Sequence, residues 1–572
     1  MRRSSVVTAV MGLAIPLLTA LPAQATASVP TTSVPTTSVP TTSVPAASAP
    51  VASVVAASVA ADTVPPADVQ SIGPGQYHAD TDTFEIAESD VAEGQIGRRH
   101  SVTTVDGTAS RPRPTPASRT DLSVFGPGWQ AEFLGGTTGR ALQVQDGSII
   151  VTDLDSDSST AYTLKTSIDL PGGAYIRKYE AEDGSKLTES TGRRPGPATI
   201  VETIPIEPGD PEDGGFTNGS GEPADPADLA HTYTWKQVGD AWRVTGVGNN
   251  AYGTSSVTYD AQGRVATVTE PAAGDEPQSV LAFRYATTTT AAGTGTGDYA
   301  GRLKEITLQS GSGSPAPVAT YAYDASGLLR TMADPRLDGA GQAAYAYDGV
   351  GRLTTVDSAS HGDWRLAFAG DSAAPAATAT SDTRRPDTSS GTPPDLSGDA
   401  IKDPDATGPS PDDFSGDVVR PFASPSYCSA AVHWMWYTRV GCAAWAAHYG
   451  WKYPSWKKLP TGYWVVGVHH DYCTGVPARP SRWKFDFRPA CDMHDYGYGL
   501  IGNTYKKYKY YLDRNRKSQV DDVFYVTMRD WTCPAYKGRY KGVKISTICK
   551  QYAWTYRQGV RFGNPKNGAD KT

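Results

Sequence analysis

The sequence predicts a multi-domain protein in which a β-rich, antiparallel region precedes a small all-α domain held by disulfides. Gly (58) and Pro (43) are frequent among the 572 residues, which favours strands and linkers over long helices. All six Cys lie between residues 428 and 549. Charge divides the chain at the same place, because residues 420–572 hold 25 basic and 9 acidic side chains, whereas the rest hold 27 and 51. This asymmetry indicates two bodies with different tasks.

The N-terminal part of the sequence predicts an export signal and a linker rather than a catalytic region. Residues 1–25 contain two Arg, an apolar run and a small-residue cleavage site, which is typical of a secretory signal peptide. Residues 26–70 repeat Ser-Val-Pro-Thr-Thr and continue into an Ala- and Pro-rich stretch that cannot bury a core. We therefore expect an exported, extracellular protein with an extended N-terminal linker.

Residues 71–370 predict antiparallel strands, because short Val, Thr, Tyr and Ile runs alternate with Gly, Asp and Pro. A degenerate repeat, Tyr-Asp-x-x-Gly followed by Arg or Leu, occurs at 259–265, 323–329 and 347–353, with a partial copy at 301–303. This pattern is typical of a β-hairpin, in which Tyr packs on a strand and Asp-x-x-Gly makes the turn.

These copies resemble the YD repeats of Rhs-type proteins, and Phe125-Gly-Pro-Gly-Trp129 resembles a segment common in that family. The resemblance implies a scaffold in front of a C-terminal effector, and four units are too few for a closed shell. An acidic, Pro- and Gly-rich stretch at 371–420 predicts a disordered linker, and the final domain is expected over 421–572.

Two helices are expected in this final domain. The first, over 486–501, would place Cys491, His494 and Tyr498 on one face, with Asp495 about 100° away. The second, over 514–531, would have Asp521 beside its inner stripe and Asp522 on the opposite side, so that Asp521 is the carboxylate able to reach another helix. The expected inner stripe consists of Val520, Phe524, Thr527, Met528 and Trp531.

The Cys pattern behind an export signal predicts three disulfides, and six Cys allow fifteen pairings. If Cys473 pairs with Cys491, Asp471 and Asp495 can meet at one hard cation, because each lies within about 7 Å of its neighbouring Cys along the chain. Calcium, which prefers oxygen ligands, suits such a site.

In order and spacing, 471–473, 488–498 and 520–525 resemble secreted phospholipase A2 of the bacterial and fungal type. The resemblance implies that His494 is the general base and that Asp521 orients it. It also implies calcium ligation by the side chains of Asp471 and Asp495 and by the carbonyl of Tyr472. The implied disulfides are Cys473–Cys491 and Cys533–Cys549, which leaves Cys428–Cys442.

The resemblance implies calcium-dependent hydrolysis of the sn-2 ester of phospholipids. Trp residues and Lys-Tyr clusters around 505–511 suit a phospholipid surface, especially an anionic one. Two alternatives stay open: an Rhs-type toxin carrying a phospholipase, with a possible inhibitor protein as partner, and a non-catalytic protein that binds membranes. No motif points to nucleic acid.

Overall fold

The computed structural model describes residues 69–105, 109–192, 196–207, 209–274, 276–336, 343–358, 360–370, 372–380, 455–467, 473–501 and 517–562. The expected signal peptide (1–25) and most of the expected linkers lie outside these residues. No helix in the described part is both long and apolar enough to cross a membrane.

The first of the two large antiparallel sheets in the described residues contains β1 to β6. Strands β1 to β5 pair in chain order, and β6 pairs with β4. The bounds are β1 Val69–Ile72, β2 Gly75–His78, β3 Thr83–Val91, β4 Ile96–Val105, β5 Ala109–Pro112 and β6 Trp129–Glu132.

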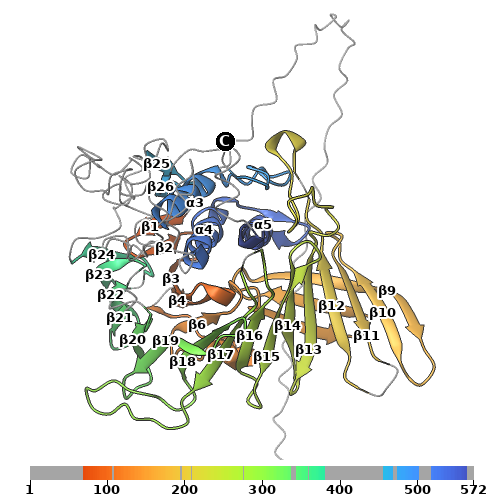
Figure 1. Ribbon diagram of the computed structural model, residues 1–572. Coiled ribbons are helices and arrows are strands. Elements are labelled where there is room, and N and C mark those ends of the chain that lie inside the picture. Colours follow the sequence, from red (N-terminus) through yellow and green to blue (C-terminus); the bar gives the residue numbers. More distant parts are fainter. Residues whose placement is uncertain are drawn as a thin grey trace, which may run out of the picture. The chain divides into compact units, whose positions relative to one another are not determined.

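In the second sheet, β7 to β24, each strand pairs antiparallel with the next strand in the chain. The large antiparallel region expected from the sequence is confirmed (Figure 1). The bounds are β7 Arg140–Gln145, β8 Ser148–Asp153, β9 Ser158–Asp169, β10 Tyr175–Glu180, β11 Lys186–Ser190, β12 Thr199–Ile204, β13 His231–Val238, β14 Ala241–Asn249, β15 Gly253–Tyr259, β16 Val265–Glu270, β17 Ser279–Tyr285, β18 Leu303–Ser310, β19 Ala316–Tyr323, β20 Leu329–Ala333, β21 Ala343–Tyr347, β22 Leu353–Ser358, β23 Gly362–Phe368 and β24 Pro375–Ala379.

The repeat copies share one conformation. Each Tyr lies at a break in strand register, and its hydroxyl donates to a carbonyl of the preceding strand. The distances are 2.8 Å for Tyr259 to Val244, 2.7 Å for Tyr285 to Val265, 2.6 Å for Tyr323 to Leu303 and 2.7 Å for Tyr347 to Leu329. The relation of these copies to YD repeats stays a prediction, since their geometry alone does not establish a family.

The Asp of each complete copy organises the turn. Its carboxylate accepts the main-chain N–H groups two and four residues later and an Arg guanidinium: Asp260, Asp324 and Asp348. The Gly of the turn has a positive φ (+74° at Gly263), which explains its presence. The partial copy at 301–303 belongs to Tyr285, because the N–H of Ala286 donates to the carbonyl of Arg302 (2.8 Å) just as the N–H of Asp260 donates to that of Arg264 (2.8 Å). Residues 287–300 are inserted within this turn.

The C-terminal part is a small helical unit. Helices α3 (Arg488–Ile501), α4 (Lys517–Trp531) and α5 (Ile545–Phe562) lie side by side (Figure 1). Two short hairpins accompany them: β25 (Ser455–Lys458) with β26 (Trp464–Gly467), and β27 (Arg539–Tyr540) with β28 (Val543–Lys544). The expected small, disulfide-linked helical region is confirmed.

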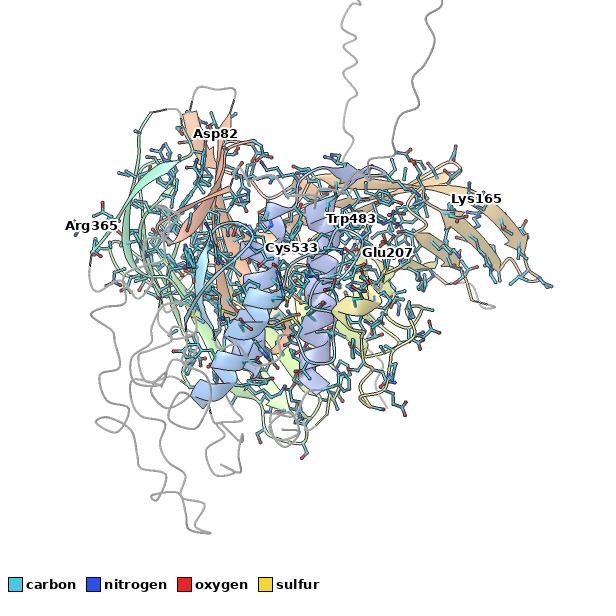
Figure 2. All side chains as sticks on the ribbon, turned by 90° about the horizontal axis from the view of Figure 1, so that it is seen from above. Asp82, Lys165, Glu207, Arg365, Trp483 and Cys533 are labelled. Atoms are coloured by element: carbon cyan, nitrogen blue, oxygen red, sulfur yellow. A yellow bond between two sulfur atoms is a disulfide. The ribbon has the colours of Figure 1, made fainter. Side chains whose placement is uncertain are left out.

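The helical unit shares its core with the strands. One cluster of buried apolar side chains runs from Phe84 and Trp235 in the sheets to Phe524 and Tyr556 in the helices. A cavity of about 130 Å³ also lies between the two parts. Figure 2 labels Glu207 and Trp483, which come from different parts of the chain and both line this cavity.

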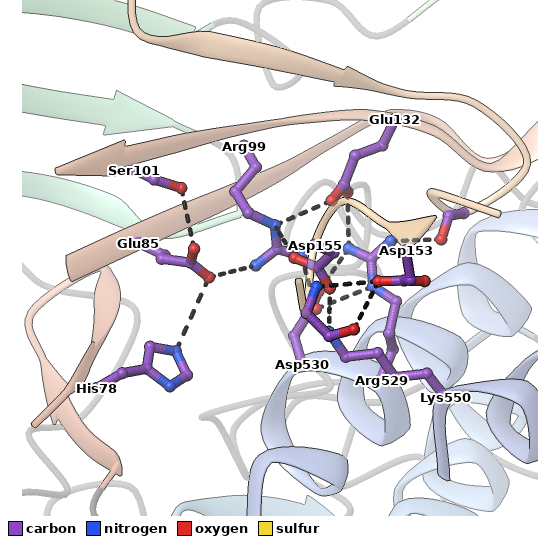
Figure 3. A network of polar contacts seen from close by, with 12 residues as sticks. His78, Glu85, Arg99, Ser101, Glu132, Asp153, Asp155, Arg529, Asp530 and Lys550 are labelled. Atoms are coloured by element: carbon purple, nitrogen blue, oxygen red, sulfur yellow. Dashed lines mark hydrogen bonds and ion pairs between the residues drawn. The ribbon is translucent and has the colours of Figure 1, made fainter. Parts of the chain in front are cut away.

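Buried and half-buried ion pairs reinforce this contact (Figure 3). Arg99 of β4 binds Glu132 (3.0 Å) and also Asp530 of α4 (2.8 Å). Arg529 of α4 also pairs with Glu132 (2.8 Å), and Lys550 of α5 pairs with Asp155. Charges of both signs therefore pair across the contact between the β-rich and helical parts.

Candidate active site

Helix α3 begins near its expected start. The carboxylate of Asp486 accepts the main-chain N–H of Arg488 (3.2 Å) and binds its guanidinium, which stabilises the first turn. The disulfide Cys473–Cys491 joins α3 to the preceding loop, with 5.3 Å between the Cα atoms. Both the pairing and the helix were expected.

A second disulfide, Cys533–Cys549, fastens η9 (Cys533–Ala535) after α4 to α5, with 5.4 Å between the Cα atoms. This pairing was also implied by the resemblance. The expected pair Cys428–Cys442 lies outside the described residues.

Helix α4 places Asp521 against α3. The expected inner stripe is buried throughout: Val520, Phe524, Thr527, Met528 and Trp531. The outer side of α4 is buried as well, against the β-rich part, where Tyr525 donates to the carbonyl of Gly135 (2.8 Å). No sequence pattern predicts this second contact, because its partners lie almost 400 residues away in the chain.

His494 and Asp521 form the central pair. Nε2 of His494 lies 2.8 Å from Oδ1 of Asp521, and the hydroxyl of Tyr498 donates to the same oxygen at 2.8 Å. The imidazole packs against the rings of Tyr498 and Phe524, with centroids 4.2 and 4.6 Å away. The ring orientation is therefore fixed by packing and by hydrogen bonding.

Lys517 completes the shell of Asp521. Its ammonium donates to Oδ2 of Asp521 (2.9 Å), to Oε1 of Glu276 (2.8 Å) and to the carbonyl of Val560 (3.1 Å). Sequence reasoning missed Lys517, although its position one turn before Asp521 on the same helix is a signal that could have found it. Glu276 comes from the loop between β16 and β17, and no local pattern points to it.

These contacts keep Asp521 ionised. Burial alone would favour the neutral acid, but the charge of Lys517 and the hydrogen bond from His494 hold the pKa of Asp521 well below its usual range. Burial likewise opposes charge on Lys517, yet Asp521 and Glu276 raise its pKa. Burial and the neighbouring Asp521 raise the pKa of Tyr498 well above 10, so its hydroxyl stays a donor.

The neighbouring carboxyl behaves in the opposite way. Asp522 is buried on the outer side of α4, where the hydroxyl of Ser89 donates to it. Burial raises its pKa to about 7, and Arg557 and Arg529 oppose this rise only in part. Asp522 therefore faces the β-rich part and not the site.

The expected calcium ligands are only partly described. Asp495 follows His494 on α3 and is half-buried. Asp471 and Tyr472 lie outside the described residues, and the described residues contain no group of three or more His, Cys, Asp or Glu able to hold a metal. The donor set still fits calcium, because it is all oxygen and the disulfide ties Cys473, two residues after Asp471, to the helix that carries Asp495.

The arrangement suits proton transfer from water. When Nε2 carries the proton donated to Asp521, Nδ1 of His494 presents a lone pair. A buried carboxylate then stabilises the imidazolium that forms after proton uptake. This chemistry needs an imidazole, an ionised partner and a water molecule, and the first two are in contact here.

The C-terminal part of the chain is similar to a known protein family. No curated protein matches the chain. The chain does match one protein family, over 106 of its 572 residues, and the matched segment contains α3, α4, α5 and both disulfides. That segment, residues 458–563, is similar to the family described as prokaryotic phospholipase A2 and supports a phospholipase A2 domain at the C-terminal end of the chain.

Proposed function

We propose that the chain is an exported, calcium-dependent phospholipase A2 that cleaves the sn-2 ester of glycerophospholipids into lysophospholipid and free fatty acid. The observation that carries the proposal is the 2.8 Å contact between His494 and Asp521 inside the segment that matches the phospholipase family.

In this mechanism His494 acts as the general base. Nδ1 takes a proton from water as the water oxygen attacks the ester carbonyl, and the imidazolium later gives that proton to the departing alkoxide. Asp521 stabilises the positive charge on the ring, and Tyr498 holds the oxygen that faces His494. No covalent acyl-enzyme forms, since water is the nucleophile.

Calcium would be held by the side chains of Asp471 and Asp495 and by the carbonyl of Tyr472. Bound there, it would polarise the ester carbonyl and compensate negative charge on the oxygen and the lipid phosphate. The remaining expectations, export through residues 1–25 and action at an anionic membrane surface, are parts of the same proposal.

Fatty-acid release from phosphatidylcholine vesicles labelled at sn-1 or sn-2 tests the proposal. The mature full-length chain should release only the sn-2 label in calcium and nothing in EDTA. If the folded, oxidised protein binds vesicles but releases neither label, the proposed enzyme is refuted and a non-catalytic membrane-binding protein takes its place.

In a second proposal the reaction is the same phospholipid hydrolysis, but the protein is a toxin and the upstream region is the carrier of its phospholipase domain. Ion pairs from the β-rich part to α4 and α5 hold the helical part against the upstream region, as a carrier role requires. A small inhibitor protein encoded beside the chain that binds it and blocks release would support this role.

A further inference from the structure

The catalytic carboxylate belongs to a charge cluster that spans both parts of the chain. Three cations from α4 and α5 meet three carboxylates: Lys517, Arg557 and Arg561 with Asp521, Glu270 and Glu276. Two of the carboxylates come from the β-rich part. Apart from Glu276, whose side chain is 26% exposed, all members are buried.

Within this cluster, both oxygens of Asp521 are engaged. Oδ1 accepts from His494 and Tyr498, and Oδ2 accepts from Lys517. The side chain therefore has one orientation that satisfies all its donors. If Lys517 no longer donated to Oδ2, only the hydrogen bonds to Oδ1 from His494 and Tyr498 would oppose rotation of the carboxylate.

Lys517 in turn depends on groups outside α4. A long, flexible ammonium side chain has many rotamers, and burial fixes one of them only if its donors find acceptors. Glu276 supplies one acceptor at 2.8 Å and the end of α5 supplies another, the carbonyl of Val560 at 3.1 Å. Glu276 also lies 3.5 Å from Nε of Arg561, so it bridges the ends of α4 and α5.

We propose that Lys517 is a positioning residue for Asp521 and that Glu276, contributed by the β-rich part, holds Lys517 in place. The upstream region thus completes the outer shell of the catalytic pair instead of only carrying it. This inference rests on the proposed function, because it assigns a role in the same hydrolysis.

The test compares Glu276→Ala with Glu276→Gln in the full-length chain, using vesicle hydrolysis at saturating calcium. Glu276→Ala should lower kcat roughly tenfold, the cost of about one charge-assisted hydrogen bond, and leave KM unchanged. Glu276→Gln should recover part of the loss, because its amide oxygen can accept from Lys517.

Glu207→Ala is the matched control. Glu207 is also a half-exposed Glu of the β-rich part that pairs with a cation of the helical part, Arg482, but it does not contact Lys517 or Asp521. It should leave kcat within twofold of the parent. Equal losses in both Ala variants would reduce Glu276 to a general interface contact and overturn the proposal.

A double-mutant cycle with Lys517→Met tests the route through the lysine. Once Lys517 is absent, Glu276→Ala should cause no further fall in kcat. Additive losses would mean that Glu276 acts by another route, and the proposal would fail.

Crystal structures of the parent and of Glu276→Ala give a readout that needs no activity. The variant should show a moved or multiply oriented Asp521 carboxylate and a longer His494–Asp521 contact. An unchanged contact overturns the positioning role even if the parent is active. An inactive parent with a displaced carboxylate in the variant would instead refute the proposed function and retain the positioning.

Discussion

Asp521 and Asp522 are consecutive on α4, yet they contact different parts of the chain and their pKa values are shifted in opposite directions. Asp521 contacts His494 and Lys517 and stays ionised, whereas Asp522 contacts Ser89 of β3 in surroundings that favour its neutral form. One helix therefore carries the carboxylate proposed to orient His494 and, at the next residue, a carboxyl buried against the β-rich part.

Asp522→Asn should stabilise the protein above neutral pH. The pKa of Asp522 is about 7 in the folded chain against about 3.8 when unfolded, so the folded state binds more protons between these values. The contribution of Asp522 to the free energy of unfolding is largest below pH 4, falls as pH rises towards 7 and is constant above that pH. Three pKa units correspond to an upper limit of about 4 kcal/mol.

Chemical denaturation between pH 4.5 and 8 measures this effect. The gain of Asp522→Asn over the parent should grow with pH and reach its maximum above pH 7. The exposed Asp80, changed to Asn, serves as control and should give a flat difference. A gain that does not change with pH would contradict a raised pKa at Asp522.

His494→Ala should abolish sn-2 hydrolysis while the fold persists. Loss of a general base typically costs 10²–10⁴-fold in rate. The variant also loses the ring packing against Tyr498 and Phe524. It loses the hydrogen bond to Asp521 as well, but Asp521 keeps Tyr498 and Lys517 as donors. Fatty-acid release and circular dichroism of the same preparation check both parts. Turnover retained by a folded variant would remove His494 from the role of base.

Asp495→Asn should raise the calcium concentration needed for half-maximal activity, because an amide replaces an anionic ligand. A calcium titration of vesicle hydrolysis measures the change, which we expect to exceed tenfold. Asp486→Asn alters the start of α3 without touching the proposed ligands and should leave the curve in place. The same curve for both variants would place the metal elsewhere.

Arg557→Met should destabilise the chain by about 3 kcal/mol, because it leaves the buried Glu270 without its 2.9 Å partner. Thermal unfolding provides the measurement. Addition of Glu270→Gln should restore much of the loss, since the uncompensated charge is then removed. Full stability of the single variant would show that Arg561 and the N–H of Gly94 suffice for Glu270.

The features that sequence predicted are those set by local rules. Helical spacing predicted that Asp521 is the carboxylate of α4 able to reach another helix, and the resemblance to phospholipase A2 paired it with His494. The Asp-x-x-Gly turns follow from hydrogen bonds within four residues of Asp260 and its counterparts. The contact of Asp522 with Ser89 and that of Lys517 with Glu276 were missed because these partners lie hundreds of residues upstream. Such contacts leave no periodicity in the chain.

The pairing of every strand from β7 to β24 with its chain neighbour has a consequence for the order of assembly. Contacts between neighbours in sequence close short loops and form early. The acids that receive the helices, such as Glu132, Asp155 and Glu270, all precede the first Cys, so they are synthesised before any thiol of the helical part. The strands can thus act as a template against which α4 and α5 pack. This packing brings Cys533 and Cys549 together before they are oxidised to a disulfide.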